Sequence, residues 1–361
     1  MTAGTGTASA SATQERTDTS SAPTGTPLLS VRNLSVHFPL KRGFIVQREV
    51  ARVRAVDGVS FDIYPGETLG LVGESGSGKT TAAKAVIQLR KPDSGSIMFD
   101  GQELLGMSNS ELRPIRRKMG MVFQDPYGSL NPRMRAGDIV GEPLKVHGLA
   151  ESGDDYRTQV SALLTPVGLS PGMAERYPNE FSGGQRQRLG VARAIAAKPS
   201  LLVLDEAVSA LDVSIQAQIL NLLQDLQDQY NLAYLFIAHD LSVVRHISDR
   251  VAVMYLGRIV ETADSKDLYE NPLHPYTQAL LSAIPTPNPR LEQSRTRIIL
   301  QGDLPSPMAP PSGCHFHTRC PIATEACSLT DPDLRQLAPN QAAACLLATG
   351  YDAAPSPVSR V

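Results

Sequence analysis

The sequence predicts an α/β fold with a mainly parallel sheet, because strand patterns alternate with helix patterns along most of the chain. Two strand patterns, Ser200–Leu204 and Leu232–Ala238, are almost wholly apolar, which is typical of strands that helices cover on both faces. Between them, Val213–Tyr230 carries a stripe of apolar side chains at helical spacing. We therefore expect both strands inside one sheet, with this helix packed on it.

The N-terminal third predicts strands and turns. Residues 1–27 are rich in Ser, Thr, Gly and Ala and hold almost no large apolar side chain, so we expect a disordered tail. Leu28–Phe38 and Val53–Tyr64 alternate as strands, and the basic segment Lys41–Arg52 predicts a loop or a hairpin extension between them. Further strands are expected at Thr68–Val72, Ser96–Phe99 and Met119–Phe123, and a helix at Thr81–Leu89.

The remainder of the chain divides by composition. Residues 136–197 are mostly helical in pattern, and Val251–Glu261 predicts a hairpin that turns at Leu256 and Gly257. Proline becomes frequent after Ile284. We place a main domain at residues 28–262, a compact C-terminal module at 263–347 and a loose tail at 348–361.

The overall composition narrows the class of protein. Among the 361 residues, 42% are hydrophobic and 19% are charged, and the formal net charge is −2, so no field that would attract a polyanion is implied. No apolar run is long enough to cross a bilayer, and the N-terminus lacks the pattern of a secretory signal. We expect a cytoplasmic protein that reaches a membrane only through a partner.

The segment Gly73–Thr81, GESGSGKTT, matches the pattern G-x-x-x-x-G-K-[ST] of a phosphate-binding loop. Glycine lets successive backbone N–H groups turn toward a phosphate, and the following helix adds its positive N-terminal end. A strand pattern precedes the loop and a helix pattern follows it, as this site requires. The predicted nucleotide-binding residues are Gly73, Ser75, Gly76, Gly78, Lys79, Thr80 and Thr81.

A second motif, LLVLDE, ends an apolar strand with the acidic pair Asp205 and Glu206. Asp205 is placed to hold Mg²⁺, and Glu206 can polarise a water for attack on a γ-phosphate. An acidic pair at a strand end can also do no more than start a helix. Beside a phosphate loop, the nucleotide interpretation is favoured.

The third motif, Phe181–Arg188, reads FSGGQRQR and places a hydroxyl and free N–H groups at the start of a basic helix. This motif resembles the signature sequence of the ATP-binding-cassette (ABC) ATPases. The order of the other motifs agrees with the family: the phosphate loop, Gln124, the signature, the acidic pair, the segment Ser209–Asp212 and His239. The resemblance covers residues 28 to about 347. It implies a RecA-like mixed-sheet core with an antiparallel β subdomain and a helical subdomain that carries the signature.

The resemblance also implies roles for single residues. Lys79 would bind the β- and γ-phosphates of ATP, and Thr80, Gln124 and Asp205 would hold Mg²⁺. Glu206 would be the general base. Three further positions match functional positions of the family. Phe38 would stack on adenine, His239 would contact the γ-phosphate, and Asp212 would lie in the loop that couples the two ATP sites. Taken alone, a histidine at a strand end is more often a packed or capping residue, and a Phe at a strand end is often core.

In the family, two ATPase domains pair head to tail, and each signature closes over the ATP of its partner. The resemblance therefore implies that Ser182, Gly183 and Gly184 serve the nucleotide of a second subunit. The chain departs from the usual pattern at Phe181, where Leu is more common, and at Ala207 and Val208, where Pro and Thr are usual. Neither departure removes a functional group.

Two segments resemble the oligopeptide/dipeptide (nickel/peptide) importer branch of the family. They are Phe123–Arg133, FQDPYGSLNPR, and Asn271–Pro289, NPLHPYTQALLSAIPTPNP. This resemblance implies an ATPase subunit on the cytoplasmic face of the cell membrane that drives uptake of di- or oligopeptides. The implied partners are a paralogous ATPase subunit in a heterodimer, two permease subunits and, indirectly, an extracytoplasmic substrate-binding protein.

All four cysteines lie in the Pro-rich C-terminal module, at Cys314, Cys320, Cys327 and Cys345. Their confinement to one small module argues for shared ligation of a metal. Four thiolates suit structural zinc or an iron–sulfur cluster, and the resemblance favours a [4Fe–4S] cluster. The spacing alone also leaves zinc and four unligated thiols open, and His315 and His317 are the feature that keeps zinc in consideration.

A different class of function is an ABC ATPase that acts on nucleic acid or ribosomes, with the cysteines as a zinc element. That function would need a second cassette in tandem or a basic groove, and the sequence shows neither. The three arginines on the signature helix, Arg186, Arg188 and Arg193, are better explained as solvated charges or contacts to a partner's nucleotide. We therefore expect no nucleic-acid partner.

Overall fold

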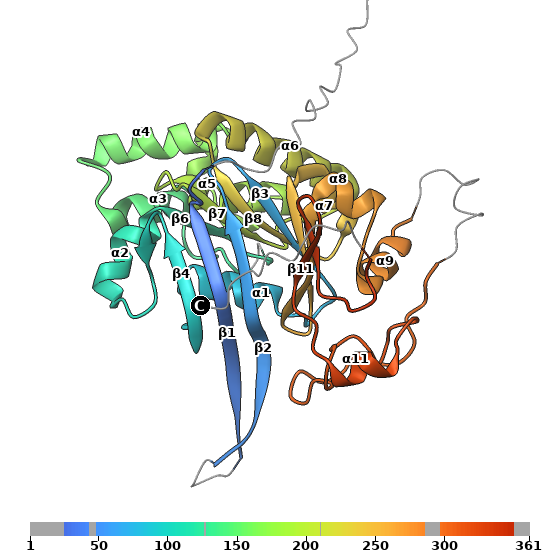
Figure 1. Ribbon diagram of the computed structural model, residues 1–361. Coiled ribbons are helices and arrows are strands. Elements are labelled where there is room, and N and C mark those ends of the chain that lie inside the picture. Colours follow the sequence, from blue (N-terminus) through green and yellow to red (C-terminus); the bar gives the residue numbers. More distant parts are fainter. Residues whose placement is uncertain (1–24, 43–47, 126–127, 210, 286–296, 350–361) are drawn as a thin grey trace, which may run out of the picture.

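The structure is a computed structural model that describes residues 25–42, 48–125, 128–209, 211–285 and 297–349 (Figure 1). Nearly all of the two predicted tails, residues 1–27 and 348–361, lies outside these ranges. Within the described residues, no helix has both the length and the apolar character that crossing a bilayer requires.

In the described part of the chain, the main sheet has eight strands in the order β11-β12-β10-β9-β3-β8-β7-β6. Five adjacent strands run parallel and confirm the predicted mainly parallel sheet. Their bounds are Thr68–Val72 (β3), Met119–Val122 (β6), Leu201–Asp205 (β7), Ala233–Ala238 (β8) and Arg250–Tyr255 (β9).

Apolar cores lie on both faces of this sheet. Leu202 and Leu204 of β7 belong to one buried cluster, whereas Leu201 and Val203 belong to the other, as the alternation of side chains along a strand requires. Helix α6 (Val213–Tyr230) has the predicted bounds and packs into the first cluster, and α1 (Lys79–Val86) packs into the second. The short helix α7 (Leu241–Ile247) follows β8 and joins the first cluster.

A separate antiparallel sheet has the order β2-β1-β4-β5. The bounds of its strands are Leu29–Arg42 (β1), Arg48–Ile63 (β2), Ser94–Phe99 (β4) and Gln102–Glu103 (β5). Strands β1 and β2 stay paired into the segment predicted as a loop or hairpin extension, so the hairpin interpretation is right, and the pair reaches beyond the rest of the molecule (Figure 1).

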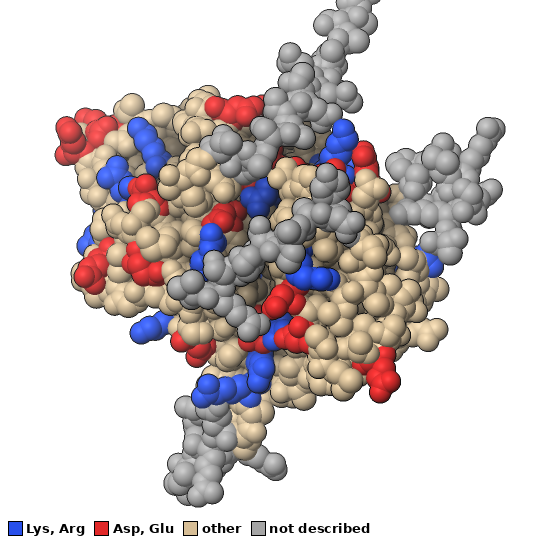
Figure 2. Space-filling model, viewed as in Figure 1, with Lys and Arg blue, Asp and Glu red and all other residues tan. Residues whose placement is uncertain are grey.

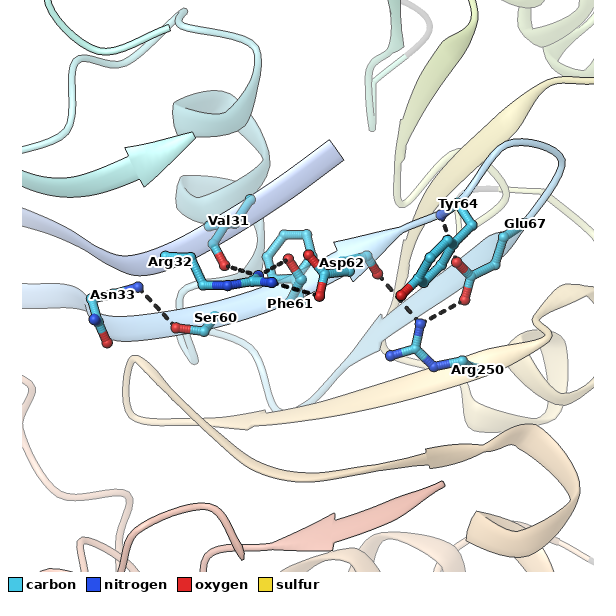
Figure 3. Close-up of polar contacts among 9 residues, drawn as sticks. All are labelled: Val31, Arg32, Asn33, Ser60, Phe61, Asp62, Tyr64, Glu67 and Arg250. Carbon is cyan, nitrogen blue, oxygen red and sulfur yellow. Dashed lines mark hydrogen bonds and ion pairs between the residues drawn. The ribbon is translucent and has the colours of Figure 1, made fainter. Parts of the chain in front are cut away.

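Polar contacts join the two sheets (Figure 3). Arg250 of β9 makes the link: it donates to Glu67, just before β3, at 2.8 Å and to the carbonyl of Asp62 of β2 at 3.4 Å. Within the antiparallel sheet, Arg32 of β1 donates to the Asp62 carboxylate at 2.8 Å. Burial raises the pKa of Glu67, and the Arg250 charge opposes this shift. These contacts hold β2 against the edge where β3 begins.

The helical part contains α2 (Asn109–Arg117), α3 (Ala136–His147), α4 (Gly153–Leu164) and α5 (Gly183–Ile195), with 3₁₀ turns at Pro171–Glu175 and Pro178–Glu180. Helix α3 ends at Gly148, which adopts φ 63°. Helices α3, α4 and α5 agree with the helical region predicted between residues 136 and 197, whereas α2 lies before it and was not predicted.

The C-terminal part comprises β10 (Arg258–Asp264), α8 (Ser265–Glu270), α9 (Pro275–Ser282), α11 (Glu325–Leu329), β11 (Arg335–Ala338) and β12 (Gln341–Ala343). Strands β9 and β10 form the predicted hairpin. Strand β10 crosses residues 262 and 263, and β12 pairs with it antiparallel, so the C-terminal residues extend the main sheet. A domain boundary at that point stays a prediction.

Candidate nucleotide site

The parallel strands bring the predicted site residues to one edge of the sheet. Val72 of β3 is in register with Ala238 of β8, and Val122 of β6 with Leu204 of β7. The segments that follow the carboxyl ends of these strands are the phosphate loop, Gln124, the acidic pair and His239. In sheets of this kind, ligands bind outside the carboxyl ends of the strands.

Two glycines of the phosphate loop are required by close backbone approach. Gly78 has φ 106°, and a Cβ there would lie 2.0 Å from the carbonyl oxygen of Ala55. Gly73 has φ 150°, and a Cβ there would lie 2.1 Å from the carbonyl oxygen of Met254. Any other residue at either position would push the loop away from the strands that support it.

Lys79 lies inside the loop, with only 4% of its surface exposed. Its ammonium group donates to the carbonyl oxygens of Gly73 at 2.7 Å and Glu74 at 2.9 Å. Burial lowers the pKa of Lys79, and the carboxylates of Glu206, Asp205 and Glu74 oppose this shift. The loop thus holds a buried cation among its own carbonyls, which is the charge that a phosphate group needs.

Thr80 and Asp205 supply oxygen atoms of the kind that coordinate Mg²⁺. The Thr80 hydroxyl donates to Asp205 Oδ1 at 2.8 Å, and Asp205 is 2% exposed. Burial raises the pKa of Asp205, and the hydrogen bond from Thr80 opposes the shift. Mg²⁺ prefers a carboxylate and neutral oxygen ligands, so the residues present suit this ion.

The side chains of two other predicted site residues, Gln124 and His239, lie beside the Glu206 carboxylate. Gln124 Nε2 donates to Glu206 Oε2 at 2.7 Å, and His239 Nδ1 lies 3.7 Å from the same oxygen. Glu206 has φ 48°, a left-handed conformation that is uncommon outside glycine. Backbone strain of this kind is often retained at functional sites, where it can position a side chain for binding or catalysis.

The signature residues form the start of α5. Ser182 is the N-cap, is exposed, and its hydroxyl accepts a hydrogen bond from Gln185 N at 3.3 Å. Gly184 packs so closely on α6 that a Cβ would lie 2.6 Å from Ile215 Cγ2. Asp212 is likewise an N-cap, of α6, and the backbone N–H of Ile215 lowers its pKa.

The three arginines of α5 are engaged within the chain. Each donates to a backbone carbonyl at 2.7 Å: Arg186 to Pro178, Arg188 to Val167 and Arg193 to Ser129. Basic and acidic side chains are interspersed over the face that Figure 2 shows. The prediction of solvated charges or contacts to a partner's nucleotide therefore needs correction, since all three side chains are partly buried and bind carbonyls of their own chain.

Phe38 lies on β1, half-buried, opposite Val53 of β2. The guanidinium of Arg90 lies 4.3 Å from the centroid of its ring. Arg90, which sequence reasoning did not identify, thus covers one face of the ring in a cation–π contact, and the adenine assignment of Phe38 stays a prediction.

The four cysteines converge on one small cavity, which His274, Phe316 and His317 also line. Burial and the three other cysteines raise the pKa of Cys314 to about 11. Among the described residues, no set of three or more His, Cys, Asp or Glu side chains is arranged around a single point as a metal ion would require. His317 lines the cavity, whereas His315 is not among its lining residues.

The fold, the phosphate loop and the acidic pair define an ATPase of the ABC class. A family model described as "ABC transporter" matches residues 56–209, and one described as "Oligopeptide/dipeptide transporter, C-terminal region" matches residues 260–327. The second match covers the C-terminal part that the ATPase core alone does not explain.

Curated relatives agree with both matches. The oligopeptide transport ATP-binding protein AppF of Bacillus subtilis is 53% identical over 89% of this chain and 97% of its own length. OppF of Escherichia coli, of the same description, is 53% identical over 85% of this chain and 92% of its own length. Among solved structures, the ATP-binding cassette MJ0796, dimeric and bound to ADP and Pi, is 29% identical, with a TM-score of 0.59 over 66% of this chain and 98% of that chain.

The chain belongs to the ATP-binding subunits of oligopeptide ABC transporters. It is an ATPase coupled to peptide import, and the predicted family, fold class and function are confirmed. The alternative of an ABC ATPase that acts on nucleic acid or ribosomes is thereby set aside. Membership implies permease subunits and a substrate-binding protein as partners.

Proposed function

We propose that the chain supplies one of two different ATPase subunits of a peptide importer and binds ATP and Mg²⁺ at the carboxyl edge of its main sheet. The observation that carries this proposal is the convergence there of Lys79, the Thr80–Asp205 pair and the Gln124–Glu206–His239 group. Lys79 binds the outer phosphates. Thr80, Gln124 and Asp205 are the residues that would hold Mg²⁺, which supplies charge neutralisation of the phosphates.

Glu206 acts as the general base in this proposal. Its carboxylate receives a hydrogen bond from Gln124 on one oxygen, which orients the group toward an attacking water. His239 lies on the same side and contacts the γ-phosphate. Because His239 is 57% exposed, a closing partner can still order it.

The dimer is head to tail, with a paralogous ATPase subunit as the partner. The exposed Ser182 and the N-terminal end of α5 offer a hydroxyl, free N–H groups and a positive dipole to a phosphate outside the chain. Binding of two ATP molecules closes the dimer, and hydrolysis reopens it. The cassette MJ0796, which is similar in fold and dimeric, supports the pairing of two ATPase domains.

A hollow of about 290 Å³ beside the Gln124 segment is the proposed seat for a cytoplasmic segment of the permease. Charges of both signs line it, on Arg133 and Arg135 and on α3, and Tyr177 also lines it. Such a surface suits a polar helix with charges of its own. This contact would hold the chain at the cytoplasmic face of the membrane.

Membrane fractionation tests the proposed seat. The chain is expected in the membrane fraction only when the permease subunits are produced with it. Glu142→Arg, in the hollow, is expected to reduce that fraction at least about fivefold, since it reverses a charge at the interface. Asp154→Arg, an equal change on exposed α4, is the control. Equal membrane recovery of both variants would contradict the seat.

The cysteine cavity is the proposed site of a [4Fe–4S] cluster. The support is that four thiols line one small cavity; a cluster takes one thiolate at each of its four corners, so the sulfurs need not meet at one point. Burial raises the pKa of Cys314, so a thiolate there would be stabilised by a positively charged ligand such as iron. Zinc and four free thiols are the competing interpretations.

Metal analysis of anaerobically purified protein distinguishes these interpretations. We expect about four irons per chain, with loss of iron in Cys327→Ala. His315→Ala should keep its iron, because His315 does not line the cavity. Zinc in place of iron, or no metal, would overturn the cluster assignment.

A further inference from the structure

Glu74, the second residue of the phosphate loop, is held by two contacts from the C-terminal part. Arg319 Nη1 donates to Glu74 Oε2 at 2.8 Å, and Arg319 Nη2 donates to Glu74 Oε1 at 3.1 Å. The hydroxyl of Tyr276 accepts a hydrogen bond from the backbone N–H of Glu74 at 2.9 Å. The carbonyl oxygen of Glu74 accepts from Lys79, so Glu74 links the C-terminal part to the phosphate-binding lysine.

The ion pair is built into a packed environment. The Arg319 side chain is only 9% exposed, and its guanidinium lies 6.0 Å from the ring centroid of Tyr255. Tyr255 packs on Tyr276 and Phe316, with centroids 4.7 Å and 5.3 Å away. A bidentate arginine–carboxylate pair with little water around it is stronger and better fixed than a surface ion pair.

The position of Arg319 is set by the cysteine segment. Its backbone N–H donates to Phe316 O at 3.0 Å, and the next residue, Cys320, lines the thiol cavity. The N–H of Cys314 donates to Cys327 O at 2.8 Å, which ties the start of this segment to α11. The turn that carries Arg319 therefore moves with the cysteine module.

The charge of Glu74 explains why the loop needs this arginine. A carboxylate within a phosphate loop repels the polyanionic nucleotide that the loop binds. Arg319 neutralises that carboxylate, whereas the backbone of Glu74 is held by Tyr276 and Lys79. We propose that Arg319 is a positioning residue for ATP, through which the C-terminal cysteine module sets the affinity of the phosphate loop.

Equilibrium titration of the full chain with a fluorescent ATP analogue and Mg²⁺ tests the proposal. Arg319→Met is expected to weaken binding about tenfold, because it removes a charge-assisted pair that compensates a carboxylate. In the assembled transporter, KM for ATP should rise by the same factor while kcat changes less than about twofold. Arg319→Lys, which keeps the charge, should recover part of the affinity.

The double variant Arg319→Met with Glu74→Gln separates charge compensation from structural damage. Removing the uncompensated carboxylate should restore binding to within about threefold of the original chain. Glu74→Gln alone should bind ATP at least as tightly as the original chain, a result that does not require Arg319→Met to fold. Failure of the double variant to recover, or weaker binding by Glu74→Gln, would overturn the proposal.

Arg258→Met is the matched control. Arg258 anchors the same module elsewhere, through Asp331 and through Asp57 of β2 at 3.1 Å. The Arg258→Met variant should have a lower melting temperature, and its ATP affinity should stay within about twofold of that of the original chain. An equal loss of affinity in Arg258→Met, or unchanged affinity in Arg319→Met, would show that the Arg319–Glu74 pair has no specific effect on ATP.

Discussion

Glu206→Gln is expected to lower the ATP turnover of the assembled transporter by a factor of about 10²–10⁴, the usual contribution of a positioned general base. Glutamine has the same shape as glutamate, and its amide oxygen can still accept the hydrogen bond from Gln124. The left-handed backbone at this position, φ 48°, is unaffected by a change at the side-chain end. Only the ability to take a proton from water is lost.

Because phosphate binding depends on other groups, ATP affinity should stay the same in Glu206→Gln. Unhydrolysed ATP should then keep the dimer closed, so the closed form becomes the dominant species in the presence of ATP and Mg²⁺. Phosphate release reports turnover, and sedimentation with the partner subunit reports closure. Glu270→Gln, an exposed change at the end of α8, should leave both unchanged. Full turnover by Glu206→Gln would remove Glu206 as the base.

Much of the nucleotide site could be predicted because its residues follow strands and start helices at fixed spacings. The apolar strand that ends at Asp205 and the glycines that precede Lys79 place both side chains before any tertiary contact is known. Helix α6 was predicted to the residue because its apolar stripe is long and uninterrupted. In these cases the residues that favour the local strand or helix are also the residues that the assembled fold needs at those positions.

The contacts of the C-terminal part could not be predicted from sequence. Arg319 and Glu74 are separated by 245 residues, and neither belongs to a motif that names the other. Strand β12 has three residues, too few for an alternating pattern, and its partner β10 lies about 80 residues earlier along the chain. Pairing of this kind depends on the assembled sheet edge rather than on any local preference.

Lys79→Ala is expected to weaken ATP binding about 10- to 100-fold, since a charge-assisted hydrogen bond to phosphate contributes about 1.5–3 kcal/mol. The loss has a second source in this structure. Lys79 is surrounded by the carboxylates of Glu74, Asp205 and Glu206, all of which act on its charge. Without the ammonium, the carboxylates of Asp205 and Glu206 repel the triphosphate. Turnover at low ATP concentration should fall by at least the same factor.

Titration with the fluorescent ATP analogue measures this loss directly, and circular dichroism with thermal melting confirms that the variant is folded. Lys91→Ala, an exposed lysine just after α1, is the control and should bind ATP normally. Unchanged ATP affinity in Lys79→Ala would contradict the phosphate-loop assignment, since the lysine is the buried cation at its centre.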